Sequence, residues 1–112
     1  MARTPTNFTN STQLSTSAVS IIPAVSSGNK AIVRKLSFYN SGSSNRYITV
    51  YVVAAAGTAG ITNVLTSKAI APGKTWNCIE VQGEVLDVGM KLQAIQDAGT
   101  DVNANCSGSN VT

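Results

Sequence analysis

The chain of 112 residues contains no histidine, and only 12% of its residues are charged. Histidine is the commonest general base and metal ligand in proteins, so its absence excludes Ser–His–Asp and Cys–His catalytic sets within one chain. We therefore expect no enzyme activity, no catalytic residues, no cofactor and no metal site. Typical soluble domains carry about 25% charged residues. The chain is either a monomer coated with Ser, Thr and Asn, or a subunit whose surface is covered by neighbouring proteins.

Long apolar runs are also absent. No stretch approaches the roughly 18 residues that a membrane-spanning helix needs, so no membrane partner is expected. The first ten residues lack the apolar core of a secretory signal peptide. The two cysteines, Cys78 and Cys106, lack metal-site spacing. They are either two buried free thiols or a disulfide, if their strands face each other at the right distance.

Acidic residues are missing from the first two-thirds of the chain. Residues 1–74 carry seven bases and no acid, while residues 75–112 carry one base and five acids, so +7 and −4 give the net charge of +3. This net charge is too small to indicate a nucleic-acid-binding protein. The two halves either interleave and neutralise each other, or form complementary patches that steer docking between subunits.

Residues 46–54 give the clearest sign of secondary structure. Aliphatic side chains alternate there with tyrosine and threonine, which is the pattern of a β-strand with one buried face. Further segments with the character of β-strands follow this one or precede it, and turn residues separate them. They lie at 18–25, 30–40, 62–70, 75–81, 90–96 and 102–108. The sequence predicts an all-β fold: an antiparallel β-sandwich, jelly-roll or Ig-like, of about 7–8 short strands.

Local features refine this prediction. Pro72 and Gly73 suit the two central positions of a type II turn. Arg34 interrupts the apolar face of its strand, which indicates either a β-bulge or a side chain that reaches solvent at the rim. Residues 1–17 are polar and show little alternation. We predict an extended N-terminal arm at 1–17, bound to neighbouring subunits, and a β-sandwich domain at 18–112.

Two groups of acidic residues have a chemical and a structural interpretation. Glu80, Glu84 and Asp87 either supply an acidic pair for sugar hydrolysis or are solvated loop charges. Asp97 and Asp101 either hold a calcium ion weakly or are hairpin-turn residues. In both cases the structural interpretation is favoured.

Several segments, in their order along the chain, carry a resemblance to known proteins. They are Gly28–Val33, Thr49–Val53, Ile70–Thr75, Gln82–Gly89, Leu92–Ala94 and Cys106–Gly108. Together they resemble a group of small tailed-bacteriophage virion proteins. The resemblance implies a compact β-sandwich that decorates or cements the capsid, or belongs to the head–tail or fibre apparatus, as a homo-oligomer. The cysteines, the charged pair Arg34-Lys35 and the N-terminal arm depart from the family's pattern.

The resemblance leads to a functional hypothesis. The chain is expected to be a capsid decoration or cement protein that stabilises the phage head as a dimer or trimer. Its partners are the major capsid protein or another virion protein, and its location is the virion, assembled in the host cytoplasm. The predicted docking residues are Thr4, Asn7, Phe8, Leu14, Arg34, Lys35 and Arg46.

Two alternatives stand beside this hypothesis. One is a tail, head–tail or fibre-base protein of the same fold. The other is a carbohydrate-binding module that stacks sugars on Tyr39, Tyr47, Tyr51 and Trp76. Outward tyrosines also make cross-strand pairs and interface contacts, and Trp76 falls on an inward parity, which speaks against the sugar-binding alternative.

Overall fold

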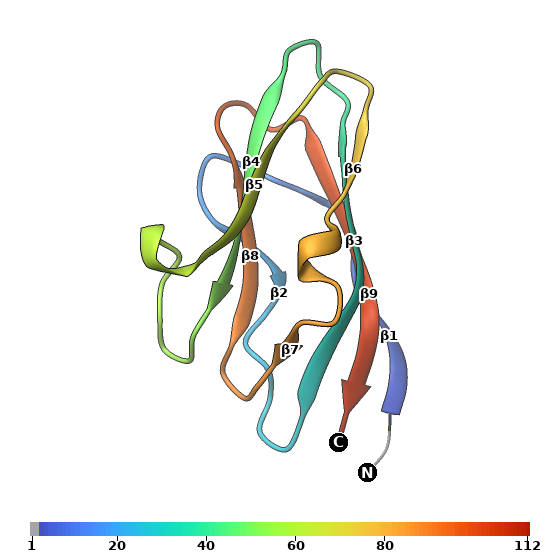
Figure 1. The fold of residues 1–112 in the computed structure, drawn as a ribbon, viewed down its shortest axis with the longest axis vertical. Helices are drawn as coiled ribbons and strands as arrows, with labels where there is room; N and C mark the ends of the chain where they lie inside the picture. Colours follow the sequence, from blue (N-terminus) through green and yellow to red (C-terminus); the bar gives the residue numbers. More distant parts are fainter. Residues whose placement is uncertain (1–2) are drawn as a thin grey trace.

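The computed structural model describes residues 3–112, apart from the side chains of residues 10 and 11. Within these residues it contains nine β-strands in two antiparallel sheets, which confirms the predicted all-β sandwich (Figure 1). The strands are β1 Arg3–Gln13, β2 Val19–Ile22, β3 Lys30–Asn40, β4 Arg46–Val53, β5 Val64–Ile70, β6 Thr75–Asn77, β7 Val85–Leu86, β8 Lys91–Gln96 and β9 Val102–Val111. Two 3-10 turns, η1 Ile61–Asn63 and η2 Ile79–Val81, complete the elements. None of the helical segments described here is long and apolar enough to cross a membrane.

The strand order is that of a jelly roll. Sheet A has the order β1-β9-β3-β6, with β7 also paired to β3, and sheet B has the order β2-β8-β4-β5. A jelly roll can be described as one long hairpin whose two arms pair along their length, here as β1/β9, β2/β8, β3/β6 and β4/β5. The hairpin is rolled up, and this brings β9 beside β3 and β8 beside β4. This order distinguishes the two predicted alternatives, because an immunoglobulin sandwich pairs its strands differently.

The N-terminal segment forms a strand of sheet A. Strand β1 pairs with β9 from Arg3 opposite Val111 to Gln13 opposite Asn103. The segment that we expected to be an arm held by a neighbour is therefore held by its own chain. Its alternation is hidden in the sequence because Thr9 and Thr12, rather than aliphatic residues, stand opposite the inward positions of β9.

Strand β3 contains the bulge that the sequence suggested. The pairing with β9 shifts between Val33 and Lys35, so Arg34 is exposed while Val33 and Leu36 are both buried. The other edge of β3 is covered by β6, then η2, then β7. The segment predicted as a strand at 75–81 thus ends at Asn77, and turn η2 interrupts the pairing.

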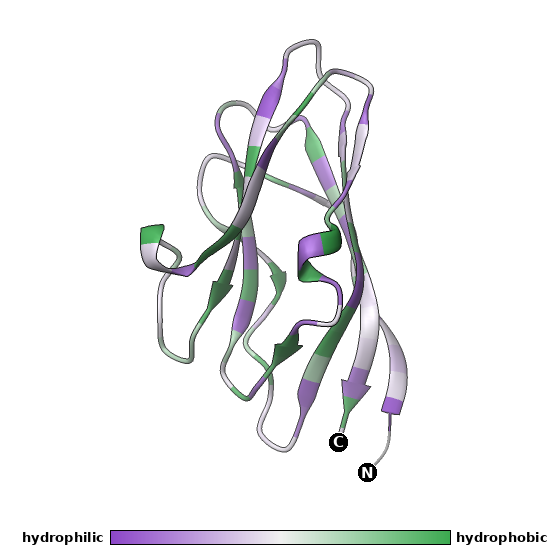
Figure 2. Cartoon of the chain, in the orientation of Figure 1, coloured by the Kyte–Doolittle hydropathy of each residue, from purple (hydrophilic) through white to green (hydrophobic). Residues whose placement is uncertain are grey.

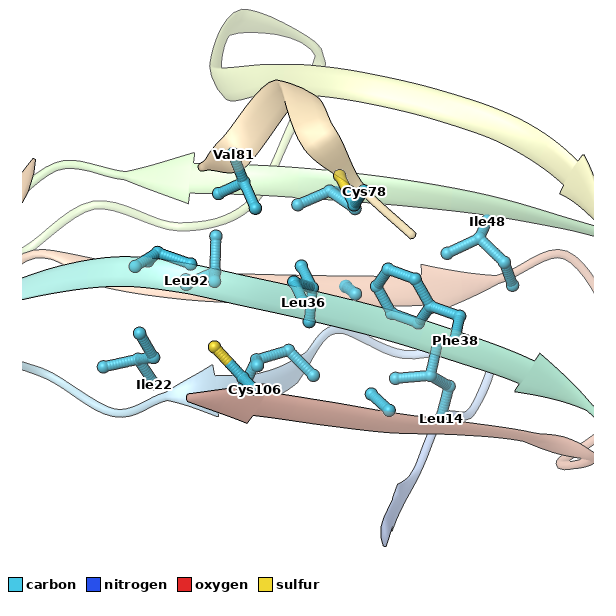
Figure 3. Close-up of a cluster of buried hydrophobic side chains, with 14 of the residues drawn as sticks. Leu14, Ile22, Leu36, Phe38, Ile48, Cys78, Val81, Leu92 and Cys106 are labelled. Atoms are coloured by element: carbon cyan, nitrogen blue, oxygen red, sulfur yellow. The ribbon is translucent and has the colours of Figure 1, made fainter. Parts of the chain in front are cut away.

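The core fills the space between the two sheets (Figure 3). Leu36 and Phe38 from sheet A lie in this cluster with Ile48 and Leu92 from sheet B. Trp76 is only 6% exposed and stacks on Phe38 with 5.4 Å between the ring centroids. The aromatic pair contributes to stability beyond its buried area, because offset rings attract each other.

Two amides with no exposed surface, Asn40 and Gln96, hold the loops at one end of the sandwich. Asn40 Nδ2 donates to the carbonyls of Ser44 and Ile70, at 2.8 and 2.9 Å, and so joins the 41–45 loop to the end of β5. Gln96 Oε1 accepts from the Val102 amide at 3.1 Å. Buried amides of this kind stabilise a fold only when their hydrogen-bonding groups are satisfied.

An ion pair adjoins Gln96 at the same end. Asp101 Oδ1 accepts from Arg46 Nε and from Gln96 Nε2, both at 2.9 Å. The hydrogen bond from Arg46, then that from Gln96, lowers the pKa of Asp101 below its ordinary value. A Cβ atom on Gly42 would overlap the second carboxylate oxygen, so this loop position requires glycine. We call Asn40, Arg46, Gln96 and Asp101 the loop clamp.

The loop clamp gives a test of the fold. Replacing Gln96→Leu removes the acceptor for the buried Val102 amide, and an unsatisfied buried donor costs about 1–3 kcal/mol. We expect the free energy of unfolding in urea to fall by about 2 kcal/mol. Gln93→Leu, on the outward face of the same strand, is the control and should change it by less than about 0.5 kcal/mol. Equal losses in the two variants would contradict a special role for Gln96.

Candidate functional site

The predicted docking residues do not form one site. Leu14 has no exposed surface and belongs to the core, because its amide donates to the Val102 carbonyl and draws the end of β1 inward. Arg46 is engaged with Asp101 in the loop clamp. Leu14 is therefore not accessible to a partner, and the charge of Arg46 is paired within the chain. Thr4 and Arg34 are exposed, at separate places on sheet A.

Asn7 and Lys35 do come together. Both pair with Ser107, from opposite sides of β9, so the three residues lie across the outer face of sheet A. With Ser37 and Asn105 they line a hollow of about 290 Å³, which we call the polar hollow. Lys35 is exposed and has no ion pair with any residue that the structure describes. The hollow therefore offers one cation and several hydrogen-bonding groups to an anionic or polar partner group.

Charge is segregated between strands and connections. None of the described strands contains Asp or Glu, while seven of the eight bases lie in strands and all five acids lie in loops or η2. The strands carry +7 and the connections −4, which gives the net +3. Two ion pairs join the halves of the chain, Lys30 with Asp87 at 3.3 Å and Arg46 with Asp101 at 2.9 Å. The interleaving that the charge pattern suggested is present at these two points.

The free edges of both sheets are protected against pairing with another strand. Strand β1 contains Pro5 and two register shifts, and β2 has four residues and is followed by Pro23. The β6–β7 edge is interrupted by η2. On β5, Lys68 stands opposite the buried Ile48 and so occupies an inward position. These are the devices by which natural sheets avoid edge-to-edge association, so side chains of faces and loops are the surfaces left for protein contacts.

A second hollow lies near the end of the sandwich opposite the loop clamp. It has a volume of about 140 Å³. Its lining consists of six apolar residues, Phe8, Ile22, Pro23, Ala24, Val25 and Ala31, and three polar residues, Ser26, Asn29 and Asn110. We call it the apolar hollow. Phe8 was predicted as a docking residue and reaches this hollow from β1. The other lining residues were not identified, because the fold brings them together from β2, β3, β9 and the connection between β2 and β3.

One aliphatic side chain is almost fully exposed. Ile61 in η1 is 92% exposed, and η1 projects from the sandwich before β5 (Figure 1). Figure 2 shows apolar colour at η1 in contrast to the paler loop before it. The Asn63 side chain accepts from the Gly60 amide and donates to the Thr58 carbonyl, each at 2.8 Å, which ties this turn together.

The aromatic residues do not assemble a common platform. Trp76 is buried, Tyr39 lies on the outer face of sheet A, and Tyr47 and Tyr51 lie on the outer face of sheet B. The Tyr47 hydroxyl is 2.8 Å from the Ser67 hydroxyl on β5, which is a cross-strand contact. The four aromatic residues therefore do not form the joint stacking surface of the carbohydrate-binding alternative.

The carboxylates are also dispersed. Within residues 3–112, no group of three or more Asp, Glu, Cys or His side chains is arranged to hold a metal ion. Glu80 accepts from the Thr66 hydroxyl at 3.2 Å, across the gap between the sheets. Asp87 and Asp101 are in ion pairs.

The two cysteines are buried free thiols. Cys106 stands opposite Leu36 on one side of β3, and the Cys78 amide donates to the Leu36 carbonyl on the other side (Figure 3). Strand β3 thus lies between them. Burial raises the pKa of Cys78 to about 11 and that of Cys106 to about 12.

Comparisons with known proteins bear on the fold. No protein-family model matches the chain, and no curated protein sequence matches it. A chain in the structure of infectious bursal disease virus, Gx strain, is similar with a TM-score of 0.50 and 14% identity, over 97% of this chain and 31% of that chain. A chain in the structure of the Gt strain gives a TM-score of 0.24 and 12% identity, over 97% of this chain and 29% of that chain. At this identity the first similarity concerns the fold, and the chain spans less than a third of its neighbour.

The burial of the thiols gives a second test. At about pH 8, near the ordinary thiol pKa, we expect neither cysteine of the native protein to react with iodoacetamide, because only a thiolate reacts and burial keeps both protonated. Both should react in guanidinium chloride, as counted by mass spectrometry. Ser107→Cys, on the outer face of β9, is the control and should be modified in the native state. Rapid native modification of Cys78 or Cys106 would contradict their burial.

Proposed function

We propose that the chain is a structural subunit of a virus particle. The observation that carries the proposal is the jelly-roll strand order together with the similarity, over 97% of the chain, to a chain in the structure of infectious bursal disease virus. Double-sheet jelly rolls recur in viral capsid domains. A fold by itself does not define a function, so the surfaces of the molecule supply the second part of the argument.

These surfaces suit an assembly role. The protected edges favour contacts through side chains. Five of the seven bases in strands have no ion pair among the described residues, and the polar hollow offers one of them, Lys35, to a partner. Low total charge lowers the cost of burying surface in protein contacts, because few ions lose their hydration. We propose that the chain works without catalysis, through binding to copies of itself and to another particle protein.

In its more specific form, the proposal is a capsid decoration or cement protein of a tailed bacteriophage. A protein that binds only the mature shell stabilises it by mass action. Each contact needs to be only moderately strong, because the symmetry of a shell repeats it many times. The partner would then be the major capsid protein, and the location the virion. A tail, head–tail or fibre-base protein is the second candidate, which the same fold and surfaces allow.

Copy number separates the two candidates. Quantitative mass spectrometry of the purified parent particle should find on the order of hundreds of copies for a shell protein and about a dozen or fewer for a tail protein. The expected result is the higher number. Particles that lack the chain altogether would overturn the proposed function.

The polar hollow is tested by charge reversal. We expect Lys35→Glu to lower the affinity for the particle by about tenfold, since a lost charge contact at an interface is worth about 1–2 kcal/mol. Lys74→Glu makes the same charge change in the 71–74 turn and should leave the affinity nearly unchanged. The measurement is occupancy of particles that lack the protein, titrated with each purified variant. Equal binding by Lys35→Glu and the wild type would exclude the polar hollow as the docking surface.

A further inference from the structure

We infer that the loop clamp is an acid-sensitive switch: it holds the 41–45 and 97–101 loops while the Asp101 carboxylate is ionised, and it releases them when that carboxylate takes up a proton. Both loops lie at the end of the sandwich opposite the start of β1 and the end of β9 (Figure 1). Such a switch operates wherever the protein is located, so it is independent of the proposed function.

Asp101 is the residue at which three parts of the chain meet. Its Oδ1 atom accepts from Arg46 Nε of β4 and from Gln96 Nε2 of β8, each at 2.9 Å. Its main-chain carbonyl accepts from the Ser41 amide at 2.9 Å and from the Ser41 hydroxyl at 2.8 Å. One residue thus ties β4, β8 and the 41–45 loop to the start of β9.

The main chain of both loops packs directly on this ion pair. A Cβ atom on Gly42 would overlap the second oxygen of the Asp101 carboxylate, and a Cβ atom on Gly99 would lie 3.0 Å from the Arg46 guanidinium. Gly99 also has a φ of +74°, which favours glycine. Because glycine brings each loop this close, a change in the position of either charged group is transmitted to the loop that covers it.

Arg46 is the charged group that faces Asp101. From β8 and from the 41–45 loop only neutral groups reach the carboxylate. Asp97, at the other end of the same connection, attracts Arg46 without forming an ion pair with it. Lys74, whose carbonyl accepts from the Asn40 amide, is exposed and has no ion pair with a described residue. The proton-sensitive contact of the clamp is therefore the one between Asp101 and Arg46.

Ionisation of Asp101 favours the closed clamp. The hydrogen bond from Arg46, and then that from Gln96, lowers the pKa of Asp101. The Asp101 side chain is 24% exposed, so protons reach it from solvent. A carboxylate whose pKa is lowered by folding stabilises the fold above its ordinary pKa, which is about 3.9 for aspartate. This stabilisation is lost as the pH falls below that value, because a neutral carboxyl forms no ion pair and is a weaker hydrogen-bond acceptor.

The release is confined to this end of the sandwich. Gln96 Nε2 keeps its hydrogen bond to the Ala98 carbonyl at 2.6 Å. Ile48 and Val50, which follow Arg46 on β4, have no exposed surface and remain in the core. We therefore expect a local opening of the two loops, of the kind that occurs in segments with few buried apolar contacts, while the two sheets stay packed.

Hydrogen exchange measured by NMR tests the switch. The reporters are the amides of Ser41 and Val102, which donate to the Asp101 carbonyl and to Gln96 Oε1. Their protection factors, which are corrected for the intrinsic exchange rate, should be about fivefold lower at about pH 2.5 than at about pH 6, since a hydrogen bond to an ionised group is roughly twice as strong as one between neutral groups. The Cys78 amide, which donates to Leu36 within the sandwich, is the internal control and should change much less.

Two variants assign the effect to Asp101. Asp101→Asn keeps the size of the side chain but cannot ionise, so its Ser41 and Val102 amides should have the lower protection already near neutral pH and show no further fall in acid. Asp87→Asn removes the other ion pair, with Lys30, and should keep the fall of the wild type. Thermal melts near neutral pH confirm that both variants are folded. A wild type without the fall, or an Asp101→Asn variant with the same fall as the wild type, would refute the switch.

Discussion

The packing of β3 and β9 in sheet A against β4 and β8 in sheet B is the interaction on which the other parts of the structure depend. These four strands are the inner members of their sheets, and their inward side chains, Phe38 and Ile48 among them, form the centre of the core. The outer elements add further side chains to this core, among them Ile21 from β2, Trp76 from β6 and Leu86 from β7. Strand β1 is held mainly by β9, and the β6–η2–β7 segment mainly by β3. A loss of packing at the centre would therefore also loosen the outer strands that pair with these four.

This dependence explains which parts of the fold were predictable. Strands β3 and β4 have a clear alternation, and the turn with Pro72 and Gly73 is formed with the expected hydrogen bond from Lys74 to Ala71. Strand β1 was missed, because threonines occupy its inward positions and its pairing is set by distant residues of β9. The same limit applies to the sites. Asn7 and Lys35 are brought together only by the register of both strands against Ser107, which no local pattern encodes.

The distribution of charge follows from the same architecture. Acids lie only in the connections, and two of them approach bases at the ends of strands: Asp101 approaches Arg46, and Asp87 approaches Lys30. The bases in the middle of β3 have no acidic neighbour in the described strands. Charge that looked like an asymmetry along the sequence is, in space, a set of bases on the strands of both sheets with acids in the connections between strands.

Protected edges and complementary surfaces have to be considered together. A small β-sandwich present at high local concentration would aggregate through open edges if strand pairing were available to it. Proline, bulges and an inward Lys68 remove that route, and so leave recognition to side chains that are specific in shape. Weak side-chain contacts become strong only where a larger assembly repeats them.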